Sequence, residues 1–215
     1  MPVREPYVTS TGEVVPSVTT IISRFKDSGP IVWWANKQGL QGLTLEKARE
    51  PAMTAGTMAH ALVEAKINSQ PMPELVGDPD TIEKARAAYS VFERWRAMTH
   101  LVIERSEVPL VSDKHRFGGR PDAIGEVGGE TVLCDWKAAN SIYSDYLLQL
   151  AAYGILWDEA HPEDPIVGGY HLIRFSKETG DFSHHHFPRL EDERAAFLIM
   201  VDLYRRVKEI DRRVK

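Results

Sequence analysis

Asp122, Asp135 and Lys137 are the residues whose types and spacing best suggest chemistry, because one predicted β-hairpin brings them together. They lie in the stretch FGGRPDAIGEVGGETVLCDWK, where Gly128-Gly129 is a strong turn signal between two apolar, β-prone segments. In this register facing residues have numbers that sum to 257, so Asp122 lies opposite Asp135. Lys137 follows Asp135 by two positions and therefore projects from the same face.

Two directly opposed carboxylates are unfavourable unless a cation lies between them. Facing residues have Cβ atoms roughly 5 Å apart, and like charges at that separation are destabilising. A divalent ion between the carboxylates, with a lysine on the same face, suits metal-assisted cleavage of a phosphodiester. The alternative is a surface ion network in which Asp122 pairs with Lys137 or with Arg120, which faces Lys137 in this register.

Pro121 provides a further indication within the same hairpin. It faces Trp136 but has no N–H to donate. The Trp136 carbonyl would then lack a strand partner and could face a metal, although a bulge at Pro121 would also fit.

The order of predicted elements indicates an α/β fold. We expect helices at 16–25, 31–40, 44–68 (in two pieces, broken near Pro51), 80–100, 141–157 and from about 190, and strands at 101–111, 116–127, 131–137, 166–175 and 181–188. The strand TVLCDWK is an apolar run that ends in a charge pair, as a buried strand does at a sheet edge. Such strand ends are common places for functional sites.

Composition predicts one intracellular, cytoplasmic domain. The chain has 215 residues, of which 43% are apolar and 27% charged, and it lacks an apolar run long enough for a membrane span or signal peptide. The single cysteine, Cys134, excludes an internal disulfide and any four-cysteine metal site. A net charge of −5 excludes coating of nucleic acid through bulk positive charge, so contacts must come from local patches such as 114–120 or 205–215.

Four motifs in order identify a family resemblance. The hairpin carries Pro121-Asp122 and Asp135-Trp136-Lys137, a later helix carries QLAAY, GTMAH ends at His60, and PSVTTII lies near the N-terminus. With these motifs the chain resembles the PD-(D/E)xK nuclease superfamily, closest to its RecB-like and phage-type exonuclease branch. The resemblance implies a restriction-endonuclease-like core, with a mixed central β-sheet flanked by helices and an N-terminal helical elaboration. Within one structural domain, we expect a helical region at 1–100, the nuclease core at 101–189 and a C-terminal helix at 190–215.

The resemblance also implies roles for individual residues. Asp122, Asp135 and Lys137 would be catalytic; His60, Asp122, Asp135 and the Trp136 carbonyl would bind metal; and Gln149, Tyr153 and Arg120 would bind substrate. The cofactor would be Mg²⁺ or Mn²⁺, as one or two ions. An iron–sulfur cluster is not expected, because the four cysteines of cluster-holding relatives are absent.

The implied function is a divalent-metal-dependent deoxyribonuclease, an exonuclease acting on DNA ends in recombination, replication or repair. Its partner would be DNA with a free or single-stranded end, with no membrane involved. Because the chain lacks a Walker A motif, any helicase or recombination partner would be a separate protein. The alternatives are a catalytically inactive DNA-binding or partner-binding member of the fold, a site- or structure-specific endonuclease, and an RNA-directed nuclease.

Several residues also have simpler interpretations. Gln149 and Tyr153 could form a polar seam against the sheet, and His60 could be a buried, hydrogen-bonded histidine. The adjacent tryptophans Trp33-Trp34 could stack on unpaired bases, but we expect them to anchor the core. The remaining cases are His184–His186, which we expect on a half-exposed strand, and Gly118-Gly119, which we expect at a bulge or close approach.

Overall fold

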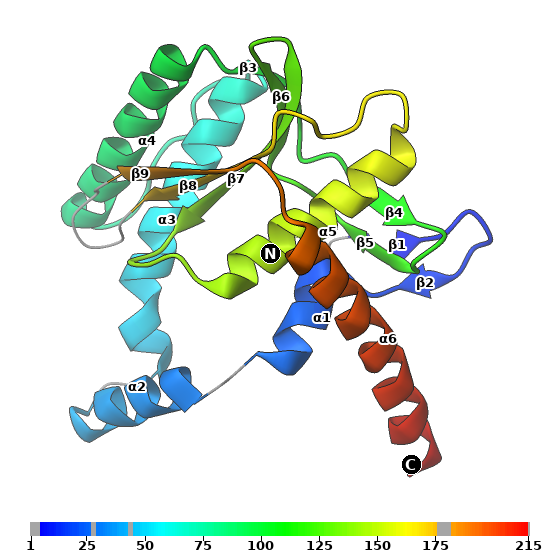
Figure 1. Ribbon diagram of the computed structural model, residues 1–215. Coiled ribbons are helices and arrows are strands. Elements are labelled where there is room, and N and C mark those ends of the chain that lie inside the picture. The colour runs from blue at the N-terminus through cyan, green and yellow to red at the C-terminus, as the bar shows by residue number, and fades with distance from the viewer. Residues whose placement is uncertain (1–4, 27–28, 43–44, 176–181, 215) are drawn as a thin grey trace.

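A five-stranded mixed sheet forms the centre of the computed structural model, which describes residues 5–26, 29–42, 45–175 and 182–214 (Figure 1). Its elements in chain order are β1 (Tyr7–Val8), β2 (Val14–Val15), α1 (Val18–Phe25), α2 (Gly29–Leu40), α3 (Leu45–Ile67), α4 (Pro79–Thr99), β3 (Val102–Ser106), β4 (Leu110–Ser112), β5 (Phe117–Gly119), β6 (Ala123–Val127), β7 (Glu130–Ala138), α5 (Ser144–Ala160), β8 (Tyr170–Phe175), β9 (Phe182–Phe187) and α6 (Glu191–Arg213). The predicted α/β class is therefore confirmed.

The strand order of the central sheet is β3-β6-β7-β8-β9. β7 pairs in parallel with β8, whereas the other neighbouring pairs are antiparallel. The parallel pair needs a crossover connection, and α5 provides it. As a result β7, which carries the predicted catalytic residues, is a central strand with a neighbour on each side.

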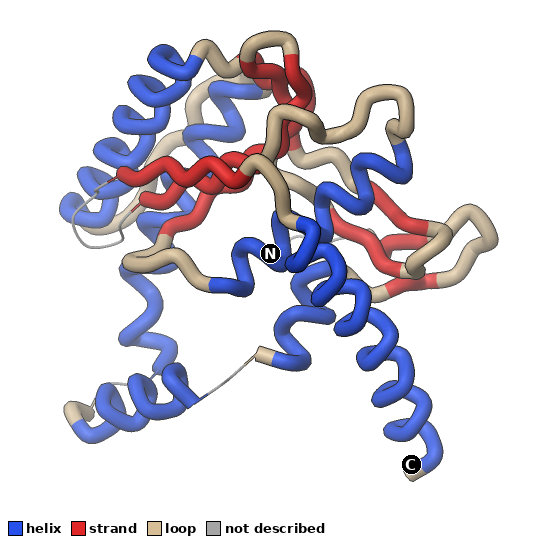
Figure 2. The backbone as a smooth tube through the Cα atoms, in the orientation of Figure 1, coloured by secondary structure: helices blue, strands red, loops and turns tan. Residues whose placement is uncertain are grey.

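Each face of the sheet is covered by a separate hydrophobic cluster. Leu133 of β7 belongs to the cluster formed with α1, α5 and α6, in which Trp157 and Phe197 are buried. Trp136 of β7 belongs to the other cluster, formed with α3 and α4, in which Phe92 is buried. Strand alternation explains this division. Figure 2 shows that α2 and the first half of α3 extend away from both layers.

The predicted register of the hairpin is confirmed. β6 and β7 pair from Val127↔Glu130 to Ala123↔Cys134, and every pair obeys the sum of 257. Gly128 and Gly129 both have positive φ, as a turn of this kind requires.

The expected long strands 101–111 and 116–127 are each broken in two. β3 and β6 pair in the central sheet, whereas β4 and β5 form a separate two-stranded sheet. The breaks occur where Pro109 and Pro121 lack a donor and where Glu107 has a positive φ of 52°. Arg120 therefore lies in a connection and does not face Lys137, which corrects that part of the predicted register.

Two further expectations require correction. α3 runs unbroken through Pro51, at the expense of one helical hydrogen bond, instead of forming two helices. The N-terminal region contains a short two-stranded sheet, β1–β2, in addition to helices. In contrast, Ser17 caps α1 as expected, because its side-chain oxygen accepts a hydrogen bond from the Thr20 N–H. No helix in the described part of the chain is long and apolar enough to cross a membrane.

Candidate active site

Asp135 and Lys137 form a buried ion pair near the C-terminal end of β7. The Lys137 Nζ lies 2.5 Å from Asp135 Oδ2, and the Asp135 side chain is 0% exposed while that of Lys137 is 18% exposed. Apart from this ion pair, neither carboxylate oxygen of Asp135 accepts a hydrogen bond from any described residue. A buried carboxylate with unused acceptor capacity is costly, and a bound cation is one way to offset the cost.

Asp122 lies immediately before β6 and joins this strand end through a backbone hydrogen bond. The Trp136 N–H donates to Asp122 Oδ2 at 2.8 Å, and the Asp122 side chain is 13% exposed. The Trp136 N–H thus binds a side chain at the edge of the hairpin, while the metal-facing role of the Trp136 carbonyl stays a prediction. The Trp136 indole packs on the opposite face, edge-on to Phe92 with ring centroids 5.2 Å apart.

His60 reaches the same carboxylate from α3. Its Nε2 atom lies 3.5 Å from Asp122 Oδ2. A Cβ atom at Gly56, one turn earlier, would lie only 2.7 Å from the Cβ atom of Ala138 at the end of β7. Glycine thus lets α3 cross the strand end closely, and the i, i+4 spacing places His60 on the same face as Gly56. This close crossing explains why the GTMAH motif begins with a glycine.

The ionisable groups at the site shift one another's pKa values. Burial, together with the charge of Asp122, raises the pKa of Asp135 to about 7 although Lys137 opposes the shift. Burial also disfavours the ionised form of Asp122, but His60 and Lys137 outweigh it and lower the pKa of that carboxyl. For Lys137 and His60, burial is outweighed by the neighbouring carboxylates, which raise both pKa values. Perturbation of this kind is typical of functional sites.

One face of α5 lines the site. The Gln149 Nε2 donates to the Tyr153 hydroxyl at 2.8 Å, and the charge of Asp135 adds to burial in raising the pKa of Tyr153. Tyr146, which the sequence reasoning missed, lies with its ring centroid 5.5 Å from the Lys137 Nζ. The signal was available, because Tyr146, Gln149 and Tyr153 follow the i, i+3, i+7 spacing of a single helix face.

Arg120 lines a small pocket beside the site. Its Nη1 is 3.8 Å from Glu107 Oε2, and its buried Nε has no hydrogen-bond partner among the described residues. The pocket has a volume of about 220 Å³ and is lined by Tyr7, Ser17, Val18, Thr19, Gly119, Arg120 and Tyr153. Gly119 allows the close approach predicted for the glycine pair, because a Cβ atom there would lie 2.7 Å from Tyr153 Cε1.

The donor chemistry of the site fits a divalent metal ion. Asp122 and Asp135 offer oxygen ligands and His60 offers an imidazole, and apart from the ion pair with Lys137 the Asp135 carboxylate accepts no hydrogen bond from a described residue. Within the described residues, however, no three histidine, cysteine or carboxylate side chains form a ready-made metal-binding group. In this structure Lys137 lies against the Asp135 carboxylate and His60 against the Asp122 carboxylate.

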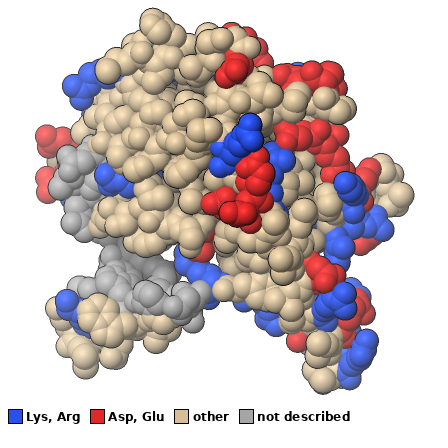
Figure 3. Space-filling model, in the orientation of Figure 1, with Lys and Arg blue, Asp and Glu red and all other residues tan. Residues whose placement is uncertain are grey.

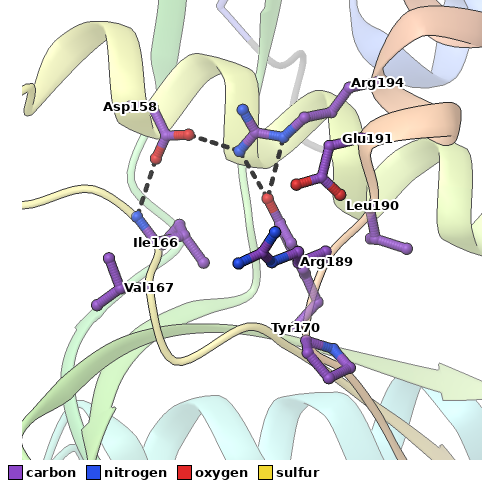
Figure 4. Close-up of a pocket in the computed structure, with 9 residues that line it drawn as sticks. Asp158, Ile166, Val167, Tyr170, Arg189, Leu190, Glu191 and Arg194 are labelled. Carbon is purple, nitrogen blue, oxygen red and sulfur yellow. Dashed lines mark hydrogen bonds and ion pairs between the residues drawn. The ribbon is translucent and has the colours of Figure 1, made fainter.

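A second pocket, of about 370 Å³, lies between α5, β8 and the start of α6 (Figure 4). It contains none of the predicted site residues. The Arg194 guanidinium in this pocket donates to Asp158 at 2.5 Å and to the Tyr170 hydroxyl at 2.6 Å. Arg194, Asp158 and Tyr170 are thus paired with one another, and we assign no chemistry to this pocket.

Comparisons with known proteins agree with this architecture. The family model described as the PD-(D/E)XK nuclease superfamily matches residues 33–212. A candidate exonuclease from Eubacterium rectale is similar in structure, with 14% identity and a TM-score of 0.50 over 69% of this chain and 64% of that one. The chain thus spans slightly less than two thirds of that protein. This likeness and the family match confirm the restriction-endonuclease-like fold.

More distant likenesses were also found. An alkaline exonuclease from Laribacter hongkongensis has 14% identity and a TM-score of 0.36, covering 73% of this chain and 84% of that one. The same enzyme in complex with dAMP has 14% identity and a TM-score of 0.38, with coverage of 74% and 85%. No curated protein matches the chain.

Proposed function

Because the chain belongs to the PD-(D/E)XK nuclease superfamily, we propose that it is a divalent-metal-dependent deoxyribonuclease that acts as an exonuclease on DNA ends. The observation that carries the proposal is the fully buried Asp135, whose carboxylate has Lys137 2.5 Å away and accepts no hydrogen bond from any other described residue. A merely structural aspartate in this position would be expected to have its acceptors satisfied. Asp122, held at the same strand end, adds the second carboxylate.

Mg²⁺ or Mn²⁺, as one or two ions, would be held by Asp122, Asp135, the Trp136 carbonyl and His60. When bound, the metal would place positive charge next to the scissile phosphate and lower the pKa of a metal-bound water molecule. Lys137, whose pKa the neighbouring carboxylates raise against burial, would turn from Asp135 toward the substrate and stabilise negative charge on the phosphate. The Tyr146 ring lies beside the Lys137 ammonium and would limit the positions that it can take.

Arg120, Gln149 and Tyr153 would bind the substrate strand. Support comes from the pocket beside the site, where the Arg120 guanidinium and the Ser17 and Thr19 side chains offer polar contacts. We infer that the substrate is DNA with a free or single-stranded end. We also infer an intracellular role in recombination, replication or repair, with any helicase or recombination protein as a separate chain.

A direct test compares the parent with Lys137→Ala on linear DNA in the presence of Mn²⁺ or Mg²⁺. We expect metal-dependent loss of DNA with the parent and little with the variant, whose folding is checked by its melting temperature. If the parent shows no metal-dependent cleavage, the protein is a silent binding member of the fold and the proposal fails. If the variant cleaves equally well, the cleavage does not depend on Lys137 and the proposed site is wrong.

The class of nuclease needs a separate experiment. Covalently closed circular DNA has no ends, so an exonuclease should leave it intact while degrading the linearised form of the same molecule. Cutting of the circle would favour an endonuclease instead. Unlabelled RNA added as a competitor would slow the reaction strongly only if RNA were the preferred substrate.

A further inference from the structure

Trp33 on α2 is exposed to solvent, contrary to the expectation that it anchors the core, whereas the side chain of Trp34 lies outside the described part of the structure. It is 66% exposed, and the neighbouring apolar residues Val32 and Leu40 are 61% and 82% exposed. A large aromatic side chain left in water is unfavourable, and such exposure often marks a binding surface. Trp33, Lys37 and Leu40 share one helix face through i, i+4, i+7 spacing.

The charge on α2 complements a polyanion. The helix contains Lys37 and no acidic residue. The Lys37 Nζ lies 5.5 Å from the centroid of the Trp33 ring, so a cation and an aromatic ring are presented together. Aromatic rings that stack on bases, flanked by positive charge for the phosphates, are the elements by which proteins hold single-stranded nucleic acid.

The position of α2 fits a strand leading to the active site. α2 packs against α3, the helix that carries His60 to the carboxylates. The helix rises about 22 Å between Leu45 and His60, a span of about six stacked nucleotides at roughly 3.4 Å each. In the space-filling view α2 forms an arm separated from α6 by an open notch (Figure 3). A single strand running along this side could contact both ends of α3.

We propose that the α2 face formed by Trp33 and Lys37 binds the single-stranded part of the substrate, with Trp33 stacking on an unpaired base. The proposal rests on the proposed function, since it takes the His60 end of α3 as the cleavage site. Lys37 contacts one part of the exposed indole, and the remaining ring surface is available to a base. A strand that occupies the cleavage site but is too short to span α3 does not reach Trp33, so its affinity should not depend on this face.

Binding of 5′-labelled single-stranded DNA, measured by fluorescence anisotropy at one fixed salt concentration with Ca²⁺ in place of Mg²⁺ or Mn²⁺, tests the proposal. We expect Trp33→Ala to weaken binding of a 12-nucleotide strand about 5- to 150-fold, the range for loss of one stacked base. Binding of a 4-nucleotide strand should not change. Trp33→Phe should retain most of the affinity, and Val32→Ala, at a similarly exposed apolar position, is the matched control.

Two outcomes would overturn the proposal. Unchanged affinity of Trp33→Ala for the long strand would exclude stacking. Equal losses in Trp33→Ala and Val32→Ala, with a smaller molecular mass in size-exclusion chromatography, would show that α2 contacts a second copy of the chain. A parent that binds in a Trp33-dependent way but never cleaves contradicts the proposed nuclease function alone, whereas normal cleavage with a Trp33-independent affinity contradicts this inference alone.

Discussion

Replacing Asp135 by asparagine should stabilise the metal-free protein relative to the parent, and this gain should be larger at alkaline pH than at acidic pH. Asp135 is fully buried, and burial with the charge of Asp122 raises its pKa to about 7 from 3.8. Between these two pH values the folded state binds more protons at Asp135 than the unfolded state does. The stability of the parent therefore falls as pH rises through that window, and asparagine, which does not titrate, removes the dependence.

The magnitude follows from the two pKa values. Between pH 5.5 and pH 8, ionisation of Asp135 should lower the free energy of unfolding of the parent by about 2 kcal/mol. In a chain of this size that corresponds to a change in melting temperature of about 4–8 °C. In the variant Lys137 loses the Asp135 charge that raises its pKa in the parent, and of the two carboxylates only Asp122 still acts against burial. Both pH values of the comparison lie below the ordinary lysine pKa of about 10.4.

The assay measures melting temperatures at pH 5.5 and pH 8, with and without Ca²⁺, for the parent, Asp135→Asn and Asp202→Asn. Asp202 is a matched control because its side chain is 60% exposed on α6. Ca²⁺ at 100 times its dissociation constant should stabilise the parent at pH 8 by about 2.7 kcal/mol, with a smaller effect at pH 5.5 and in Asp135→Asn. A variant that follows the parent across pH, or responds equally to Ca²⁺, would refute a buried, metal-binding Asp135.

Three further predictions concern Lys137, Gly56 and His171. Lys137→Ala should reduce turnover about 10²–10³-fold while keeping the Ca²⁺ response, and a lost response would mean that it holds the ligands instead. Gly56→Ala should reduce activity, because its Cβ atom would lie 2.7 Å from that of Ala138, whereas Gly39→Ala, with open space, should not. His171, stacked on His184, has its pKa lowered to about 4 by burial and by the neighbouring histidines. The unfolded state therefore binds the extra proton, so urea unfolding at pH 4.5 and pH 7 should show that acidification destabilises the parent by about 2 kcal/mol more than it destabilises His171→Leu.

The hairpin could be predicted from sequence because its determinants are local. The Gly128-Gly129 turn and the alternation of apolar residues in β6 and β7 fix which residues face each other. The same alternation placed Asp135 and Lys137 on one face, and their ion pair agrees with it. The breaks at Glu107 and Arg120 were missed, although Pro109 and Pro121 both marked them.

Those breaks matter for the site, because they release Arg120 and Asp122 from the strand ladder. The Glu107 N–H donates to the Asp122 carbonyl at 3.2 Å, and its carboxylate lies 3.8 Å from Arg120. If both strands had continued as predicted, Asp122 would be confined to the ladder opposite Asp135. Its carboxylate accepts the Trp136 N–H instead, while the His60 ring approaches the same oxygen. The breaks in the two strands thus leave the Asp122 carboxylate in a position that the His60 ring of α3 can approach.

Which helix reaches the strand end depends on contacts between distant parts of the chain. The residues around GTMAH do not predict that α3 crosses β7 at Ala138, because the periodicity of a helix indicates its buried face but not the element packed against that face. The family resemblance was therefore the only sequence-level route to His60. Gly56 restores a physical argument, since its missing Cβ atom permits a crossing that places His60 next to Asp122. By the same reasoning, the exposure of Trp33 escaped prediction because the local sequence of α2 does not specify whether another element will cover that side chain.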